Sequence, residues 1–187
     1  MQLRRLAATT AVALVAASSL AACGSDGPVS HGATEGVYVT TGDLAYQVQI
    51  SRQLNAADYE DRDFLKGLPA SDATLAKGQE WFAVFVRVFN RSKQAHPAAS
   101  QFVIRDTTGK EFQPVQLDLN TNVVAYRPQV VNPGDQLPVD DSLARVNTTQ
   151  GGMVLFKVPT AAYANRPLEL HITPPQGGGE ATVDLDV

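Results

Sequence analysis

The sequence predicts an all-β protein, built as an antiparallel β-sandwich of seven to nine strands. Three observations support this prediction. Apolar and polar side chains alternate with a period of two over many short segments, turn-forming residues separate these segments, and helical patterns are scarce. The chain has 187 residues, a suitable length for one such domain and a targeting segment.

Alternating segments mark the half-buried strands. Clear examples are 46–51, 168–173 and 182–187, in which apolar residues take every second position. The segment 81–89 differs, because apolar residues nearly fill both faces and only Arg87 interrupts them. A strand of this composition is covered on both sides, so we expect it at the centre of a sheet. Further short strands are expected at Phe102, Ile104, Phe112, Val115 and the run 153–158.

Turn chemistry separates the strands. Residues 106–110 predict a hairpin turn with a glycine in the left-handed region, and the Asn-Pro-Gly-Asp run at 132–135 predicts a tight turn. Short helical turns are expected at 56–65 and 159–165. The glycine- and proline-rich run 174–179 should be a loop, because the alternation after it predicts a last strand that returns to the sheet.

Residues 1–22 have the layout of an export signal. Arg4 and Arg5 form a positive start, and residues 6–20 are apolar or small and carry no charge. The apolar run is too short and too rich in alanine for a membrane span, which needs about 20 strongly apolar residues. The segment therefore predicts export of the chain rather than a spanning helix.

The end of this signal, Leu-Ala-Ala-Cys at residues 20–23, resembles a bacterial lipobox. The resemblance implies that the Cys23 thiol receives a diacylglycerol and that a peptidase cuts before it. The new amino group can then be acylated, typically with palmitate. The alternative is an ordinary signal peptide, with Cys23 left as a free thiol. Cys23 is the one cysteine of the chain, and a lone thiol in an exported protein favours the lipoprotein interpretation.

The chain after the predicted lipid anchor has two parts, a tether and a folded domain. Residues 24–35 contain little apolar bulk and predict a flexible tether with a reach of roughly 20 Å. Residues 36–187 are expected to fold as one domain. We therefore expect the protein at the cell membrane, held by the lipid on Cys23 and facing the extracytoplasmic side.

The stretch 78–172 also resembles a known family. It resembles the bacterial family of telokin-like, immunoglobulin-like extracytoplasmic domains of unknown function, and a secreted mycobacterial antigen shares that architecture. The resemblance implies an immunoglobulin-like sandwich in an export context, often on lipoproteins, and no agreed activity, so it transfers no functional residues. Inserts around 58–76 and 120–128 depart from the minimal pattern. The resemblance rests on the ordered segments 85–92, 102–112, 131–135, 152–159 and 168–170.

Composition excludes several classes of protein. Lys and Arg number 15 against 19 Asp and Glu. Arg4 and Arg5 are the charged residues of the signal, so the mature chain keeps 13 basic against 19 acidic groups, a net charge of −6. This balance argues against a nucleic-acid partner, which requires a basic surface. A single cysteine excludes a disulfide scaffold and a thiolate metal cluster.

No catalytic constellation is visible, so we do not expect an enzyme. The chain has no G-x-S-x-G elbow and no phosphate-binding glycine loop. A copper site lacks its ligands, because the mature chain has one methionine and its cysteine is expected to carry lipid. Zinc bound by His31, His96 and His171 is disfavoured because His31 lies in the predicted tether. We therefore expect no metal and no cofactor.

An acidic cluster at Asp58, Glu60, Asp61 and Asp63 is the candidate cation site. Carboxylate oxygens at this density suit Ca²⁺, although the spacing fails the EF-hand rule. The alternative is a solvated polar loop, or a helical turn with its acids near the N-terminus. The second interpretation, a solvated loop or helical turn without a bound cation, is favoured.

A second candidate surface lies in the insert 120–128, at Tyr126 and Arg127. Tyrosine and arginine are common anchors of protein interfaces. Tyr126 also fits an inward-packing residue at the edge of the core. The sequence leaves both interpretations open.

These observations predict a membrane-anchored lipoprotein that acts as a non-enzymatic interaction or envelope module, with an envelope protein as its partner. The alternative function is binding of a small ligand or of calcium through the acidic 58–63 loop. The sequence does not specify the partner or the oligomeric state.

Overall fold

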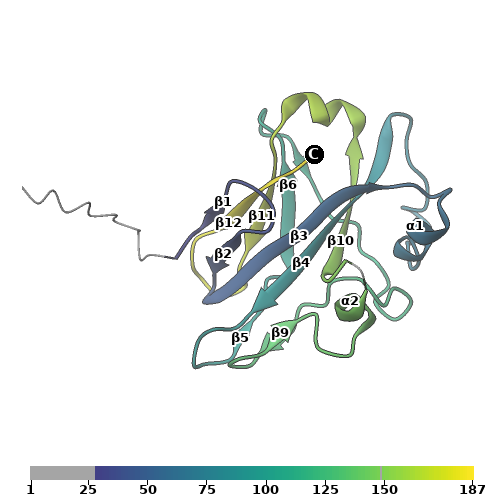
Figure 1. Cartoon of the computed structure of the whole chain (residues 1–187). Helices are drawn as coiled ribbons and strands as arrows, with labels where there is room; N and C mark the ends of the chain where they lie inside the picture. The colour runs from purple at the N-terminus through teal and green to yellow at the C-terminus, as the bar shows by residue number, and fades with distance from the viewer. Residues whose placement is uncertain (1–27, 148) are drawn as a thin grey trace, which may run out of the picture.

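A computed structural model describes residues 28–147 and 149–187, so the predicted signal and Cys23 lie outside the described residues. Seven strands of four or more residues and five of two residues are present in the described part of the chain (Figure 1). They form two five-stranded sheets and one two-stranded sheet. The prediction of an all-β sandwich is confirmed.

The first sheet has the strand order β1-β12-β11-β6-β7. Its neighbours are antiparallel except for β1 and β12, which run parallel. The predicted turn at 106–110 joins β6 to β7, and Gly109 adopts a φ of 84° there. The strands are β1 (His31–Gly32), β12 (Ala181–Leu185), β11 (Leu168–Thr173), β6 (Gln101–Arg105) and β7 (Glu111–Phe112).

The second sheet has the order β10-β4-β3-β2, and β9 also pairs with β4. The segment predicted to be central, β4, lies between β3 and β10 and is antiparallel to both, so this prediction is confirmed. A separate pair joins β5 to β8. The strands are β10 (Gly152–Pro159), β4 (Gln79–Phe89), β3 (Leu44–Leu54), β2 (Tyr38–Thr41), β9 (Gln136–Leu137), β5 (His96–Pro97) and β8 (Val130–Val131).

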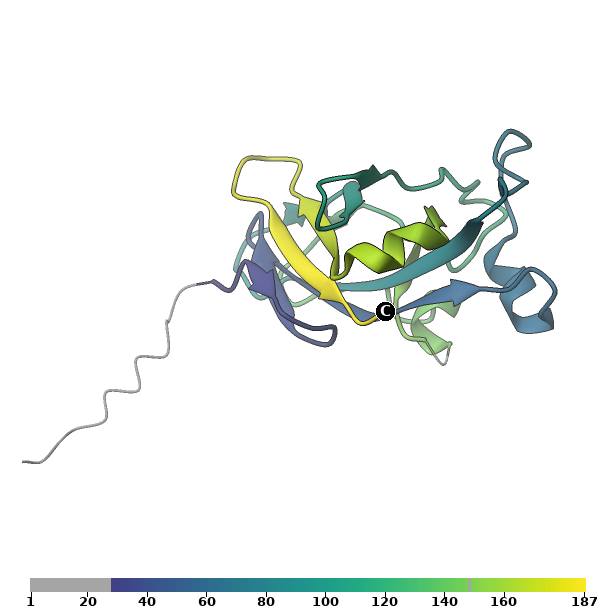
Figure 2. The same ribbon diagram turned by 90° about the horizontal axis from the view of Figure 1, so that it is seen from above.

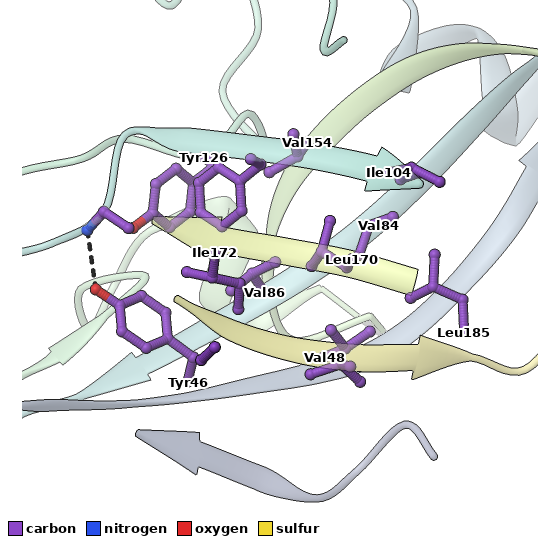
Figure 3. Packing of buried hydrophobic residues seen from close by; sticks show 14 of the residues in the cluster. Tyr46, Val48, Val84, Val86, Ile104, Tyr126, Val154, Leu170, Ile172 and Leu185 are labelled. Carbon is purple, nitrogen blue, oxygen red and sulfur yellow. Dashed lines mark hydrogen bonds between the residues drawn. The ribbon is translucent and has the colours of Figure 1, made fainter. Parts of the chain in front are cut away.

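The main core fills the space between the two sheets. Alternate residues of β4, from Phe82 to Val88, face it and are fully buried. The opposite wall comes from β6 and β11, for example from Ile104, Leu170 and Ile172 (Figure 3). Because the side chains of a strand point alternately to opposite faces, this leaves a second apolar set on the other side of β4.

That second set is covered by a third layer of structure. Trp81, Ala83 and Phe85 of β4 belong to a separate buried cluster. Phe64 of helix α1 (Tyr59–Phe64) and Ala144 of helix α2 (Leu143–Val146) complete it. The insert 58–76, the insert 120–128 through Val124, and the later helix α2 therefore supply the cover for the outer face of the sheet.

The short helices agree with the sequence in two places. Helix α1 lies inside the predicted 56–65 turn, and the 3-10 helix η1 (Thr160–Asn165) lies inside the predicted 159–165 turn. Helix α2 was not predicted, because it is a single turn that owes its position to Ala144 packing on the outer cluster. The last strand, β12, returns to the first sheet as the alternation predicts.

The boundary of the predicted tether needs a correction. His31 and Gly32 form β1 and pair with Thr182 and Val183 of β12, so residues 31–35 belong to the folded domain. Backbone pairing holds this segment, and the Thr182 amide donates to the Ser30 carbonyl at 2.8 Å. The sequence did not indicate this, because edge pairing through the backbone requires no apolar side chain.

Two buried tyrosines allow a matched test of this core. The Tyr46 hydroxyl accepts a hydrogen bond from the Ala99 amide at 2.9 Å (Figure 3), and burial raises the pKa of Tyr46 to about 12 although this bond lowers it. The Tyr126 hydroxyl is buried without a partner among the described residues.

We expect Tyr46→Phe to destabilise the fold by about 1–3 kcal/mol, because it leaves the buried Ala99 amide without a partner. Tyr126→Phe removes only an unpartnered hydroxyl and should leave stability equal or slightly higher. Urea unfolding followed by Trp81 fluorescence measures both. Equal losses of unfolding free energy in the two variants would contradict a stabilising role for the Tyr46–Ala99 hydrogen bond.

Candidate interaction groove

A groove of about 770 Å³ lies between helices α1 and α2 in the described part of the chain. Tyr59 and Phe64 of α1 lie on one wall, and Leu143 and Val146 of α2 lie on the other. The loop that contains Val123 contributes the remaining apolar part of the surface. The groove therefore belongs to the third layer of the structure, outside the sandwich itself.

Exposed apolar side chains gather at this groove. Eight large hydrophobic residues are exposed among the described residues, and four of them line it. These are Tyr59 at 77% exposure, Val146 at 65%, Leu143 at 58% and Val123 at 49%. Scattered apolar residues are normal on a protein surface, but a grouped set around a concavity is typical of an interaction site.

The two ends of α1 explain how it presents this surface. The Asp58 carboxylate caps the helix by accepting a hydrogen bond from the Glu60 amide at 2.8 Å. Phe64 packs edge-on against Phe85 of β4, with ring centroids 5.3 Å apart. Because Phe64 is fixed inward, Tyr59 at the start of the helix remains exposed, with the Arg62 guanidinium over its ring.

A buried asparagine joins α1 to the loop on the other side of the groove. The Asn122 amide nitrogen donates to the Phe64 and Lys66 carbonyls, each at 2.9 Å. Its amide oxygen accepts from the backbone amides of Val124 and Ala125 at 3.2 and 2.9 Å. All the hydrogen-bonding capacity of this side chain is used to hold the groove in shape.

The structure does not bring the four predicted calcium ligands together. Asp58 caps α1, Asp61 is buried against Arg52 at 2.6 Å, and Asp63 pairs with Lys66 at 2.7 Å. Within residues 28–147 and 149–187, the group of Asp58, Glu60, Asp61 and Asp63 does not place three ligand atoms within 4.8 Å of one another. The helical-turn alternative describes these acids better than the calcium site does.

The second candidate, Tyr126 with Arg127, also needs a correction. Tyr126 is buried in the main core and packs edge-on against Phe102, with centroids 5.0 Å apart. Burial also raises the pKa of its hydroxyl well above the usual value. The Arg127 guanidinium donates to the Leu119 and Asn122 carbonyls and braces its own loop. The inward-packing alternative is therefore correct for Tyr126.

Sequence reasoning missed the residues that the structure brings together. Leu143 and Val146 are spaced three apart in an otherwise polar segment, and this spacing was the available signal of one exposed helical face. His31 and His171, which were separated by the tether prediction, lie on one face of the first sheet, on the two strands that flank β12, and both are paired with Thr182 in the register. His96 lies apart from them on β5.

No protein-family model matches the chain, and no curated protein matches its sequence. Solved structures do match. The YjhA protein of Bacillus subtilis is 14% identical to this chain, with a TM-score of 0.56. The match covers 82% of this chain and 99% of that chain. MPT63, a secreted protein of Mycobacterium tuberculosis, is 15% identical, with a TM-score of 0.49. The match covers 86% of this chain and 99% of that chain. An uncharacterised β-sandwich protein of Clostridium difficile is 10% identical, with a TM-score of 0.41. The match covers 83% of this chain and 95% of that chain.

These likenesses concern the fold alone. The match to YjhA covers nearly the whole of that chain, and the expected immunoglobulin-like sandwich is confirmed by the two packed sheets described above. Among the described residues, the helices are all too short or too polar to cross a membrane.

The Arg52–Asp61 pair under the groove predicts a pH dependence. Burial by itself raises the pKa of the Asp61 carboxyl, but hydrogen bonds from Arg52 and the Asn55 amide and the charge of Arg52 lower it overall. The folded state therefore binds this proton less readily than the unfolded state, and the pair stabilises the fold at neutral pH.

Asp61→Asn should destabilise the protein by about 1–3 kcal/mol at neutral pH, because it weakens hydrogen bonds to a charged group. The difference from the wild type should narrow as the pH falls below about 4 and the wild-type carboxylate is protonated. Melting temperatures across this pH range measure the effect. The exposed Asp63→Asn is the control and should change little; a constant gap at all pH values would contradict the prediction.

Proposed function

We propose that the protein is a lipid-anchored envelope module that binds an extracytoplasmic protein partner through the groove between α1 and α2. The observation that supports this most directly is the grouping of Tyr59, Val123, Leu143 and Val146 around one concave surface. An interface of this kind has an apolar centre and a polar rim. The rim here carries the mutually paired charges Asp63 and Lys66.

The proposed contact is non-enzymatic. The Arg52–Asp61 and Asp63–Lys66 pairs beside the groove are engaged with each other or with the fold, and Glu60 is a further charged residue that lines it. Tyr59, Val123, Leu143 and Val146 supply exposed hydrocarbon and aromatic surface. Such groups contribute binding free energy by leaving water, and they supply no acid, base or nucleophile.

The position of the groove suits a tethered protein. Strand β1 lies at one end of the sandwich and α1 at the other, in both views of the molecule (Figures 1 and 2). Attachment through Cys23, eight residues before β1, therefore directs α1 away from the membrane. The groove is then accessible to a partner in the envelope.

Photo-crosslinking tests the groove. A photoreactive residue in place of Leu143 should yield a discrete crosslinked species in cells, and Val146→Asp in the same chain should remove it, because a charge cannot be buried at the interface. Mass spectrometry identifies the species.

Two matched controls use Val130, which is 59% exposed and lies outside the groove. A photoreactive residue at position 130 should not give the same species. The variant Val130→Asp should leave the crosslink from position 143 intact. An identical species from both positions, or one that survives Val146→Asp, would contradict the proposed interface.

Intact-mass analysis tests the anchor. The exported wild-type protein should begin at Cys23 and carry the added mass of its acyl chains. Cys23→Ala should remove that mass and release the protein from the membrane fraction, because each buried methylene contributes about 0.8 kcal/mol to anchoring. A mature wild-type chain without acyl mass would show an ordinary secreted protein.

A further inference from the structure

Three side chains on neighbouring strands converge on the outer face of the first sheet. His31 lies on β1, Asp184 on β12 and Glu169 on β11, and these three strands are adjacent (Figures 1 and 2). Glu169 is directly opposite Asp184 in the register. One nitrogen or oxygen atom from each side chain lies within 4.8 Å of the others, and no other such group of three His, Cys, Asp or Glu exists in 28–147 and 149–187.

The separations suit a small cation. His31 Nδ1 lies 3.5 Å from Glu169 Oε1, and the other ring nitrogen, Nε2, lies 3.9 Å from Asp184 Oδ2. One cation can bind only one of these nitrogens, so the ring has to turn for a single nitrogen to meet both carboxylates. Bonds of about 2.0–2.1 Å in a tetrahedral zinc site place neighbouring ligand atoms roughly 3.3–3.4 Å apart. The His31 side chain is half exposed, so its ring can turn in this way.

A buried histidine orients one of these carboxylates. His171 is 4% exposed, and its Nε2 lies 3.0 Å from Glu169 Oε2. Its Nδ1 lies 2.8 Å from Glu180 Oε2. Glu169 therefore directs one oxygen to His171 and the other to His31. Metal sites use such outer partners to hold a ligating carboxylate in one orientation.

A hydrogen bond from the neighbouring strand keeps the His31 ring on this face of the sheet. Its Nδ1 lies 2.9 Å from the Thr182 hydroxyl, on the strand residue that is paired with His31 in the register. The backbone pairing of β1 with β12 and this hydrogen bond act together. An exposed side chain is thus kept on the same face as the two carboxylates rather than turned away from them.

The local charge favours a cation. Glu169, Asp184 and Glu180 place three carboxylates around the two histidines. Burial raises the pKa of Glu180, but hydrogen bonds from His171 and Thr173 and the charges of His171 and Arg105 lower it overall. Arg105 pairs with Glu111 at 2.7 Å, but it also lies opposite Glu169 in the register and contacts the His171 ring, so its charge offsets part of this negative charge.

We propose that His31, Glu169 and Asp184 bind a divalent transition metal ion, with Zn²⁺ as the preferred ion and water as the fourth ligand. A set of one imidazole and two carboxylates suits Zn²⁺, whereas Ca²⁺ takes six to eight oxygen ligands. The ion fastens the segment that contains β1 to the last strand of the domain. Seven residues lie between Cys23 and His31, a span of at most about 29 Å over eight Cα steps. Any effect on the anchored domain rests on the proposed lipidation, but metal binding does not.

Calorimetry with ZnCl₂ on the untagged exported protein tests the site. One equivalent of Zn²⁺ should bind, and His31→Ala and Asp184→Asn should each abolish this binding. His171→Gln should weaken it by about 10–100-fold, as expected for a residue that positions a ligand. His96→Ala is the matched control, because His96 also lies beside a carboxylate, Asp43 at 3.8 Å, and should bind as the wild type does.

Hydrogen exchange separates a site from a general loss of structure. Zn²⁺ should slow exchange of the Thr182 amide, which donates to the Ser30 carbonyl beside β1, and should not do so in a folded His31→Ala variant. Circular dichroism confirms that each variant is folded. No stoichiometric binding by the wild type, or equal loss in His96→Ala, would overturn the metal site. Binding without slower exchange would overturn the fastening role. CaCl₂ should have neither effect, and a stronger response to Ca²⁺ would overturn the choice of metal.

Discussion

Strand β4 is buried on both faces, and this constraint organises the rest of the molecule. One face packs against the first sheet across the main core, and the other requires separate cover for Trp81, Ala83 and Phe85. A minimal two-layer sandwich would expose that second apolar face to water. The insert that carries α1, the insert 120–128 and helix α2 remove it from water, so the third layer follows from the composition of a single strand.

Side-chain hydrogen bonds to the backbone join these layers where apolar packing has no direction. Asn122 connects the end of α1 to the neighbouring loop with four hydrogen bonds, and Tyr46 fixes the segment after β5 through the Ala99 amide. Hydrophobic contacts determine which faces meet, but they do not specify the angle of approach. Buried amide and hydroxyl groups supply this specificity, because a buried donor or acceptor left without a hydrogen bond destabilises the fold.

The two ends of the sandwich carry different chemistry. The end at α1 and α2 presents apolar surface in a groove, while the face of β1, β12 and β11 presents histidines and carboxylates. Under the proposed attachment through Cys23, the groove would be free for contacts with other molecules, and the polar face would lie close to the attachment. An association surface and a fastening point can therefore coexist on one domain without competing for the same residues.

Periodicity predicted longer strands such as β3, β4, β11 and β12 and the central position of β4, and turn residues predicted the turn at 106–110, because alternation and glycine are local properties of the chain. Tertiary structure decided the candidate sites. The sequence pattern allowed Tyr126 to face either solvent or the core, and packing against Phe102 placed it in the core. The acids at 58–63 took separate roles, with Asp58 as a helix cap, Asp61 paired with Arg52 and Asp63 paired with Lys66. His31 joined the sheet through backbone hydrogen bonds, which leave no trace in side-chain pattern. Proximity between residues 31, 169 and 184 depends on strand order, and strand order is set by packing across the whole domain rather than by any one segment.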